Sequence, residues 1–153
     1  MNPNDRQVGG DHYKTGYPPW DLFEDYGIGY MECNVIKYVQ RWRNKGKPEE
    51  DTGKADHYLD KLIDLHTNRG RMAKANVPIA VINRFAKENG LTPTERAIVQ
   101  NMAKWSEMTG LHAAKVQIAD LMAEAYDLVH PEITMAEGLG LTKGASCQPS
   151  DHG

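Results

Sequence analysis

The sequence predicts an all-α protein with an N-terminal extended arm, an antiparallel helical core, a C-terminal helical hairpin and a disordered C-terminal tail. No stretch of useful strand length alternates apolar and polar residues, whereas apolar residues recur at spacings of three and four along most of the chain. Pro, Gly and capping residues interrupt this pattern where helix ends are expected. With 153 residues, 40% of them hydrophobic, the chain can bury one core or two small ones.

The N-terminal residues 1–18 are expected to form an extended arm or loop, because they are polar and rich in Gly and Pro. Pro19 suits the first position of a short helix, which runs to about Tyr26 and is ended by Gly27. The arm therefore leads directly into the helical part of the chain.

Two longer helices are predicted next, over about residues 29–44 and 48–67. Residues 45–48 interrupt the pattern between them, and three consecutive acids favour the positive N-terminal end of the second helix. The short connection makes the two helices antiparallel neighbours. Together with the arm they are expected to form a first domain over residues 1–68.

A weakly periodic stretch, residues 69–77, is interpreted as a linker to the second part of the chain. The region 78–130 is predicted to be a helical hairpin used for oligomerisation. Its helices are expected over about residues 78–89, 92–109 and 112–129.

The clearest helix start in this region is a capping box, with Thr92 as N-cap, Pro93 in the first turn and Glu95 at the third helical position. After the last helix, residues 131–153 are Gly-rich and expected to form a largely disordered tail.

Composition excludes several classes of protein. The formal net charge of -3 gives no reason to expect duplex DNA as a partner, since duplex binders usually show a basic footprint. No apolar run reaches the length of a membrane helix, and the N-terminus lacks the layout of a secretory signal. Cys33 and Cys147 fit neither a disulfide framework nor a zinc site, so a reducing cytoplasm without a membrane partner is expected.

One face of the helix over 29–44 combines cations, an amide and a phenol. Asn34, Lys37, Tyr38 and Arg41 follow the spacing i, i+3, i+4 and i+7, beside an apolar stripe on the same helix. Arg offers a bidentate fork, Lys a point charge and Tyr a ring with a hydroxyl, which together suit a phosphate next to a base or sugar. The alternative is a solvated basic face.

The next helix repeats this spacing with Lys54, His57, Tyr58 and Lys61, so the polar edges of the two helices are expected to converge on one groove. Lys54 is the best further phosphate ligand, whereas Lys61 is interpreted as an ion-pair partner of neighbouring acids. The Gly-flanked arm adds three candidates for stacking and hydrogen bonding to the same ligand: His12, Tyr13 and Lys14.

No metal site is expected, and no catalytic residue can be assigned. Asp56, Asp60 and Asp64 are spaced to share one helix face and are better explained as a solvated acidic face than as ligands of a divalent metal. The histidines form no pair with zinc-ligand spacing, and no standard P-loop is present.

The segment 91–100 resembles the opening helix of a LuxR-type helix-turn-helix. The helix that would then read bases, over 112–129, offers only Lys115 and Gln117 against three acids. Nucleic-acid binding is therefore kept as the weaker alternative.

Five motifs follow one another over residues 8–66: Gly10-Asp11-His12-Tyr13, Pro19-Trp20-Asp21, Asn34-x-x-Lys37-Tyr38-x-x-Arg41, Lys45-Gly46 and Asp51-x-x-Lys54-Ala55-x-x-Tyr58-Leu59. This pattern resembles a family of small phage proteins of largely unknown function. Its better characterised relative is the podophage nucleotide kinase that lacks a P-loop. The resemblance implies a phage origin and a nucleotide ligand, although Cys33 and Gly53 depart from the usual pattern.

Two functions follow from these observations. The first is a nucleotide kinase-like phosphotransferase acting on deoxynucleoside monophosphates, with ATP and Mg as cofactors. The second is a nucleotide sponge that needs no cofactor and sequesters a nucleotide-derived defence signal. For both functions we expect a nucleotide ligand, a homo-oligomer and a location in the cytoplasm of an infected host cell.

Overall fold

The computed structural model describes residues 2–6, 8, 10 and 15–140. Within these residues the protein is helical and contains no strand, which confirms the predicted all-α class. The elements are the 3-10 turn η1 (Pro3–Asp5) and the helices α1 (Pro19–Tyr26), α2 (Tyr30–Arg41), α3 (Pro48–Arg69), α4 (Ile79–Glu88), α5 (Pro93–Lys104), α6 (Met108–Val129) and α7 (Pro131–Gly138).

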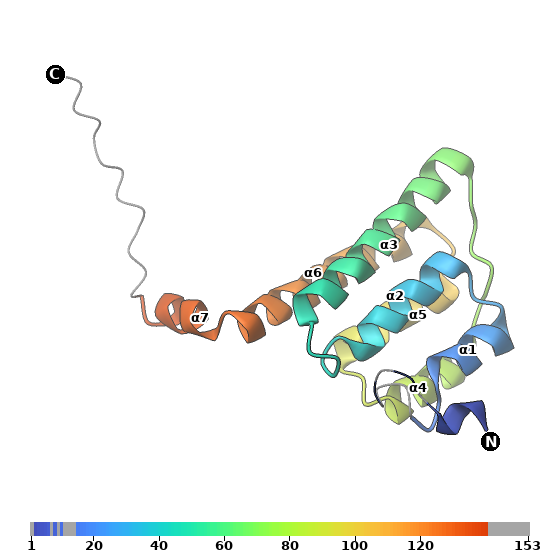
Figure 1. Ribbon diagram of the computed structural model, residues 1–153. Helices are drawn as coiled ribbons and strands as arrows, with labels where there is room; N and C mark the ends of the chain where they lie inside the picture. The colour runs from blue at the N-terminus through green and yellow to red at the C-terminus, as the bar shows by residue number, and fades with distance from the viewer. Residues whose placement is uncertain (1, 7, 9, 11–14, 141–153) are drawn as a thin grey trace.

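Helices α2 and α3 lie side by side and antiparallel, as their short connection predicts (Figure 1). Behind them, α6 packs against α3, and α5 packs against both α2 and α6. Helices α1 and α4 lie at the edge of this group, and α7 continues from the end of α6 away from the body.

A single hydrophobic cluster joins the two parts of the chain that the sequence divides at residues 69–77. It includes Val35 from α2, Trp42 directly after α2 and Leu59 from α3, together with Ile98 from α5 and Ile118 from α6, all fully buried. The predicted first domain and the predicted hairpin region therefore share one core. The core is shared because α2 and α3 together leave an apolar stripe on each helix uncovered. Helices α5 and α6 pack over these stripes.

The predicted linker is fixed to the body at both ends. Near its start, Arg71 forms a two-point ion pair with the buried Glu32 of α2, at 2.6 and 2.7 Å. Near its end, Val77 is fully buried and its N–H donates to the carbonyl of Ala103, 3.0 Å away. The weak periodicity of this stretch therefore reflects an extended segment held by specific contacts.

The boundary between the last two long helices differs from the prediction. Helix α5 ends at Lys104, Trp105 is extended, and α6 begins at Met108, so Gly110 lies inside α6 and does not end a helix. The indole of Trp105 donates to the Glu32 carboxylate at 3.2 Å, which anchors the chain at this turn. A Cβ at position 110 would lie 3.4 Å from the Cβ of Trp105, which is ordinary van der Waals contact, so packing alone does not require glycine here.

The tail also begins differently. Residues 131–138, expected to be disordered with the rest of 131–153, form α7, which has Pro131 in its first turn and Glu132 at its positive end. Both residues are helix-start signals. The prediction gave more weight to the Gly-rich composition of the whole tail. Residues 141–153 lie outside the described part of the chain.

The capping box at the start of α5 is confirmed, and its glutamate has a second role. Thr92 Oγ1 accepts from the Glu95 N–H at 3.2 Å, and Glu95 Oε1 accepts from the Thr92 N–H at 3.0 Å. The other oxygen, Oε2, accepts from Trp42 Nε1 at 2.9 Å and from Arg43 Nε at 3.2 Å. The cap therefore also connects α5 to the end of α2.

The Cys33 thiol is expected to be unreactive in the folded protein. Burial, assisted by the nearby Glu32, raises the pKa of Cys33 to about 12, and the thiol donates to the carbonyl of Ile28 at 3.3 Å. Since the thiolate is the reactive form, alkylation by iodoacetamide at pH 8 should be far slower in native protein than in urea. Mass spectrometry of a Cys147→Ser chain measures this, and equal rates in the two states would contradict the burial of Cys33.

Candidate functional site

Tyr38 is the centre of a cluster formed by the facing sides of α2 and α3. Its ring is mostly buried and stacks on the ring of Tyr58, with centroids 5.9 Å apart and an interplanar angle of 18°. Three cations surround the same ring: Lys37 Nζ lies 4.8 Å, Arg41 Cζ 4.5 Å and Lys54 Nζ 5.5 Å from its centroid. These residues are called the tyrosine–cation cluster below.

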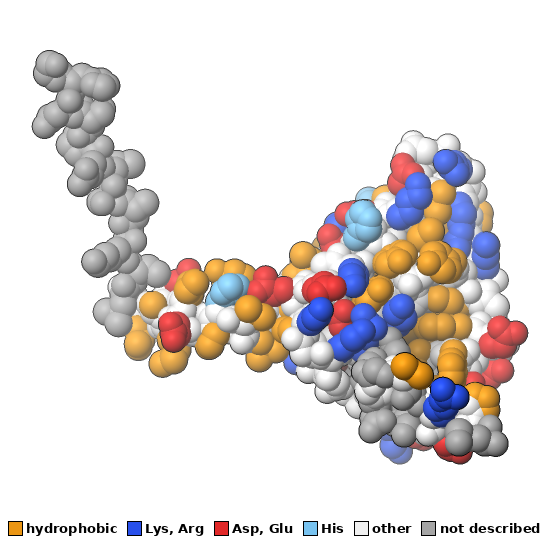
Figure 2. Space-filling view, viewed as in Figure 1, with side chains coloured by type: hydrophobic (Ala, Val, Ile, Leu, Met, Phe, Trp, Pro, Cys, Tyr) orange, Lys and Arg blue, Asp and Glu red, His pale blue; other side chains and the backbone are white. Residues whose placement is uncertain are grey.

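Cation–π attraction explains why three positive groups gather around one phenol ring, since the face of an aromatic ring carries negative electrostatic potential. Figure 2 shows basic side chains in blue grouped on the face formed by α2 and α3, with apolar side chains beside them. The sequence placed Lys37, Tyr38 and Arg41 on one face of α2 and Lys54 and Tyr58 on α3. The structure brings the two sets together.

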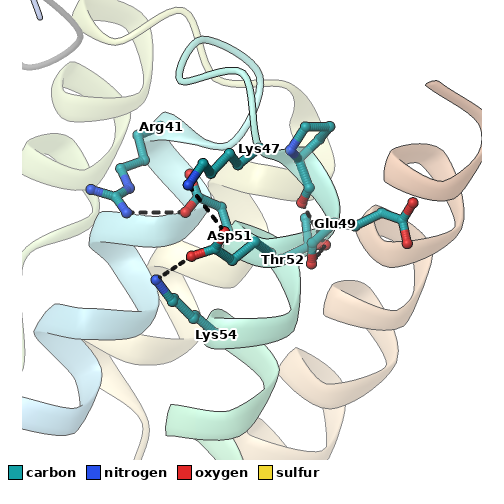
Figure 3. A network of polar contacts seen from close by, with 8 residues as sticks. Arg41, Lys47, Glu49, Asp51, Thr52 and Lys54 are labelled. Carbon is teal, nitrogen blue, oxygen red and sulfur yellow. Dashed lines mark hydrogen bonds and ion pairs between the residues drawn. The ribbon is translucent and has the colours of Figure 1, made fainter. Parts of the chain in front are cut away.

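Arg41 is the most enclosed cation of the cluster. Its side chain is 8% exposed, and its Nη2 lies 3.0 Å from Oδ1 of Asp51, whose side chain is 2% exposed. In Figure 3 the two side chains point toward each other from α2 and α3. Asp51 Oδ2 is also buried and has no hydrogen-bond partner among the described residues. The pair holds the guanidinium against the face of Tyr38.

Lys54 also forms an ion pair and is much more exposed than Arg41. Its side chain is 44% exposed, and its Nζ lies 2.8 Å from Oε1 of Glu50, one turn earlier on α3. The hydrogen bond with Lys54 is the main cause that lowers the pKa of Glu50, and the same bond raises the pKa of Lys54. Lys47 approaches the other oxygen of Glu50 at 3.7 Å, so two lysines converge on one exposed carboxylate (Figure 3).

Tyr58 connects the cluster to a third tyrosine. The ring of Tyr30, at the first position of α2, meets the Tyr58 ring edge to face, with centroids 6.2 Å apart. A hydrogen bond with Tyr30 is the main cause that raises the pKa of Tyr58. Because Tyr30 is 66% exposed, an aromatic surface lies open beside the cations.

The remaining predicted positions on the two helices serve the fold. Asn34 is buried, and its Nδ2 donates to the Tyr30 carbonyl at 2.9 Å within the first turns of α2. Lys61 pairs with Asp64 at 3.3 Å, as predicted. His57 is exposed on α3. Since Asn34, Tyr38 and Arg41 are all buried, this face of α2 is not the solvated basic face that was the alternative.

The predicted site residues of the arm, His12, Tyr13 and Lys14, lie outside the described residues. The described part of the arm is attached to α1, where Trp20 Nε1 donates to Asn4 Oδ1 at 2.7 Å.

The acidic side of α3 faces α6 at two positions. Lys115 Nζ lies 2.5 Å from Asp56 Oδ1 and 2.7 Å from Asp60 Oδ1. Lys115, considered above as a base-reading residue, therefore connects two helices. Within residues 2–6, 8, 10 and 15–140, no group of three or more His, Cys, Asp or Glu side chains is placed to hold a metal ion.

Sequence reasoning missed two residues that contact the cluster. Tyr30 precedes Asn34 by four residues, so extending the polar face of α2 by one turn would have found it. Glu50 was interpreted only as a partner for the helix dipole, although its i, i+4 spacing to Lys54 is a local signal for this ion pair.

An all-helical protein with a cationic, tyrosine-rich surface cluster is thus the class that fold and site define. A family model described as a protein of unknown function (DUF3310) matches residues 9–60, about a third of the chain. The match spans α1, α2 and the first part of α3, and so includes the cluster.

The searches of curated proteins and of solved structures returned no match. The family match carries no activity with it and no link to a nucleotide kinase, so the activity implied by the sequence resemblance stays a prediction. Among the described residues no helix is long and apolar enough to cross a lipid bilayer.

Proposed function

We propose that this chain binds a nucleotide at the tyrosine–cation cluster and acts in the cytoplasm of an infected cell as a nucleotide kinase-like phosphotransferase on deoxynucleoside monophosphates. The observation that carries the proposal is the convergence of Lys37, Arg41 and Lys54 on the ring of Tyr38. Three cations beside exposed aromatic rings match the two parts of a nucleotide, which are an anionic phosphate and a flat base.

Exposure assigns different roles to the cations. Lys54 and the half-buried Lys37 reach the surface and would contact phosphate oxygens directly. Arg41 lies against Tyr38 and, fixed by Asp51, holds that ring in place without leaving its ion pair. The exposed ring of Tyr30, in edge-to-face contact with Tyr58, offers the stacking surface.

The proposed reaction moves one phosphoryl group. A phosphate oxygen of the bound monophosphate attacks the terminal phosphorus of ATP, the bond to the bridging oxygen breaks, and ADP leaves with that electron pair. Such transfer depends mainly on positioning and on neutralising charge, which fixed cations supply. Mg²⁺ would enter together with ATP and screen its phosphates.

One observation favours the second candidate, a sponge that binds a nucleotide-derived signal without turnover. The two carboxylates beside the tyrosine–cation cluster already form ion pairs. Asp51 pairs with Arg41, and Glu50 pairs with Lys54 and Lys47. A site of this kind can bind an anion without presenting an uncommitted general base.

A product assay distinguishes the two candidates. The purified chain is incubated with Mg-ATP and a nucleotide panel that includes deoxynucleoside monophosphates and nucleotide-derived signals, and products are separated by ion-exchange chromatography. Formation of ADP and a deoxynucleoside diphosphate supports the phosphotransferase, whereas intact ligand retained at stoichiometric occupancy after gel filtration supports the sponge. Neither turnover nor retained ligand across the panel would refute nucleotide binding at this cluster.

Removing the two accessible cations should abolish tight binding. The Lys37→Ala/Lys54→Ala double variant is expected to bind the selected nucleotide on the order of 100-fold more weakly, because two charge-assisted contacts to phosphate are lost. Isothermal titration calorimetry measures the affinity. The matched control is Lys61→Ala/Lys74→Ala, which removes two exposed lysines elsewhere and should bind normally. Equal affinities in the two double variants would place the site elsewhere.

A further inference from the structure

Helix α6 is apolar on two faces, and the rest of the described chain covers only one. The buried face consists of Leu111, Ala114, Ile118, Leu121 and Ala125. The outward face carries an exposed strip at spacing i, i+3, i+7 and i+10, which we call the outer strip: Val116, Ala119, Ala123 and Tyr126. An exposed apolar strip of this kind often marks a protein–protein contact.

The end of α6 and all of α7 project from the body (Figure 1). No residue of α7 is buried, and Ile133, Met135 and Leu139 are exposed, as is Val129 just before it. Figure 2 shows orange side chains along this projecting part. A helix of eight residues with no packed face is marginal in water, so it needs a covering surface.

Charge decides the orientation of that covering surface. Residues 116–140 contain five Asp and Glu and no Lys or Arg, whereas residues 15–115 contain fifteen Lys and Arg against thirteen Asp and Glu. A partner with its own acidic end beside this one would be repelled. A partner running in the opposite direction would place each acidic end over a body with a slight positive excess.

We propose that a second copy of this chain covers the outer strip, with the two α6 helices antiparallel across a two-fold axis. The strip is self-complementary in that arrangement, because Ala119 faces Ala123 of the partner subunit and Val116 faces Tyr126 of the partner subunit. The two alanines allow close approach of the helices at the centre, and the larger residues pack at either end. Helix α7 then lies along the partner's body.

The mass of the full chain in solution tests the dimer. Light scattering after gel filtration should give twice the chain mass of 17.2 kDa for the wild type. The Ala119→Glu/Ala123→Glu variant should give the mass of one chain, since it buries four carboxylates at the contact. The control is Ala80→Glu, the same change at an exposed alanine of α4, which should remain a dimer.

Disulfide cross-linking tests the antiparallel pairing even if the glutamate variant were to misfold. In a Cys147→Ser background, a mixture of Ala119→Cys and Ala123→Cys chains should form a covalent dimer on oxidation, and a mixture of Ala119→Cys and Ala80→Cys chains should not. A monomeric wild type at high concentration, or a folded glutamate variant that stays dimeric, would overturn the proposal. A foreign protein that binds the strip of a monomeric chain would overturn it equally.

Discussion

Replacing Glu32 with alanine is expected to lower the free energy of unfolding by about 3–5 kcal/mol, which is the usual cost of removing one partner from a buried ion pair. Glu32 is 1% exposed and accepts two hydrogen bonds from Arg71 and one from the indole of Trp105. The alanine would leave a mostly buried guanidinium and an indole N–H without their acceptor. Urea unfolding followed by circular dichroism measures the loss.

The control for this variant is Glu24→Ala, at an exposed glutamate of α1, which should change stability by no more than about 0.5 kcal/mol. The Arg71→Ala variant should be destabilised to a similar degree as Glu32→Ala. The double variant should cost much less than the sum of the two, because both remove the same interaction. A cost below about 1 kcal/mol for Glu32→Ala would show that the pair does not hold the extended segment on α2.

Arg41→Ala is the second variant with a large expected effect, again about 3–5 kcal/mol of stability. Without Arg41, the buried Asp51 carboxylate would lose its ion-pair partner. Its Oδ2 already has no partner among the described residues. Chemical denaturation measures this as well. The exposed pair Lys54 and Glu50 provides the control, since replacing both with alanine should leave stability nearly unchanged.

A paired replacement separates the structural role of Arg41 from its proposed role in binding. Arg41→Met together with Asp51→Leu substitutes apolar groups for both charges and should recover most of the stability lost in Arg41→Ala. The nucleotide affinity of this folded variant should still fall, because the guanidinium that packs against the Tyr38 ring is gone. Wild-type affinity in a stable double variant would mean that Arg41 serves the fold alone.

The helices could be predicted from the sequence because their signals are local. The capping box of Thr92 and Glu95, the Pro19 start of α1 and the Gly27 end of α1 each act within one or two helical turns. One helix end differs from its local signal. The end predicted at Gly110 lies instead at Lys104, next to Trp105, whose indole donates to Glu32, a residue 73 positions earlier in the chain.

The candidate site was predicted in part. The spacing along α2 and α3 identified Lys37, Tyr38, Arg41, Lys54 and Tyr58, and the short connection indicated that they would face one another. Periodicity does not show which polar group becomes buried or which acid pairs with which cation. The pair of Arg41 with Asp51 therefore appeared only in the structure, whereas the i, i+4 spacing of Glu50 and Lys54 is a sequence signal for theirs.

The sequence by itself determined the helices, most of their ends and the cations and tyrosines that two of them bring together, because these depend on residues a few positions apart. The tertiary structure decided that one core joins the two halves, that Arg71 holds the extended segment on Glu32, and that α6 keeps a second apolar face exposed. The physical reason is that burial and ion pairing depend on which surfaces meet, and residues far apart in the chain supply those surfaces.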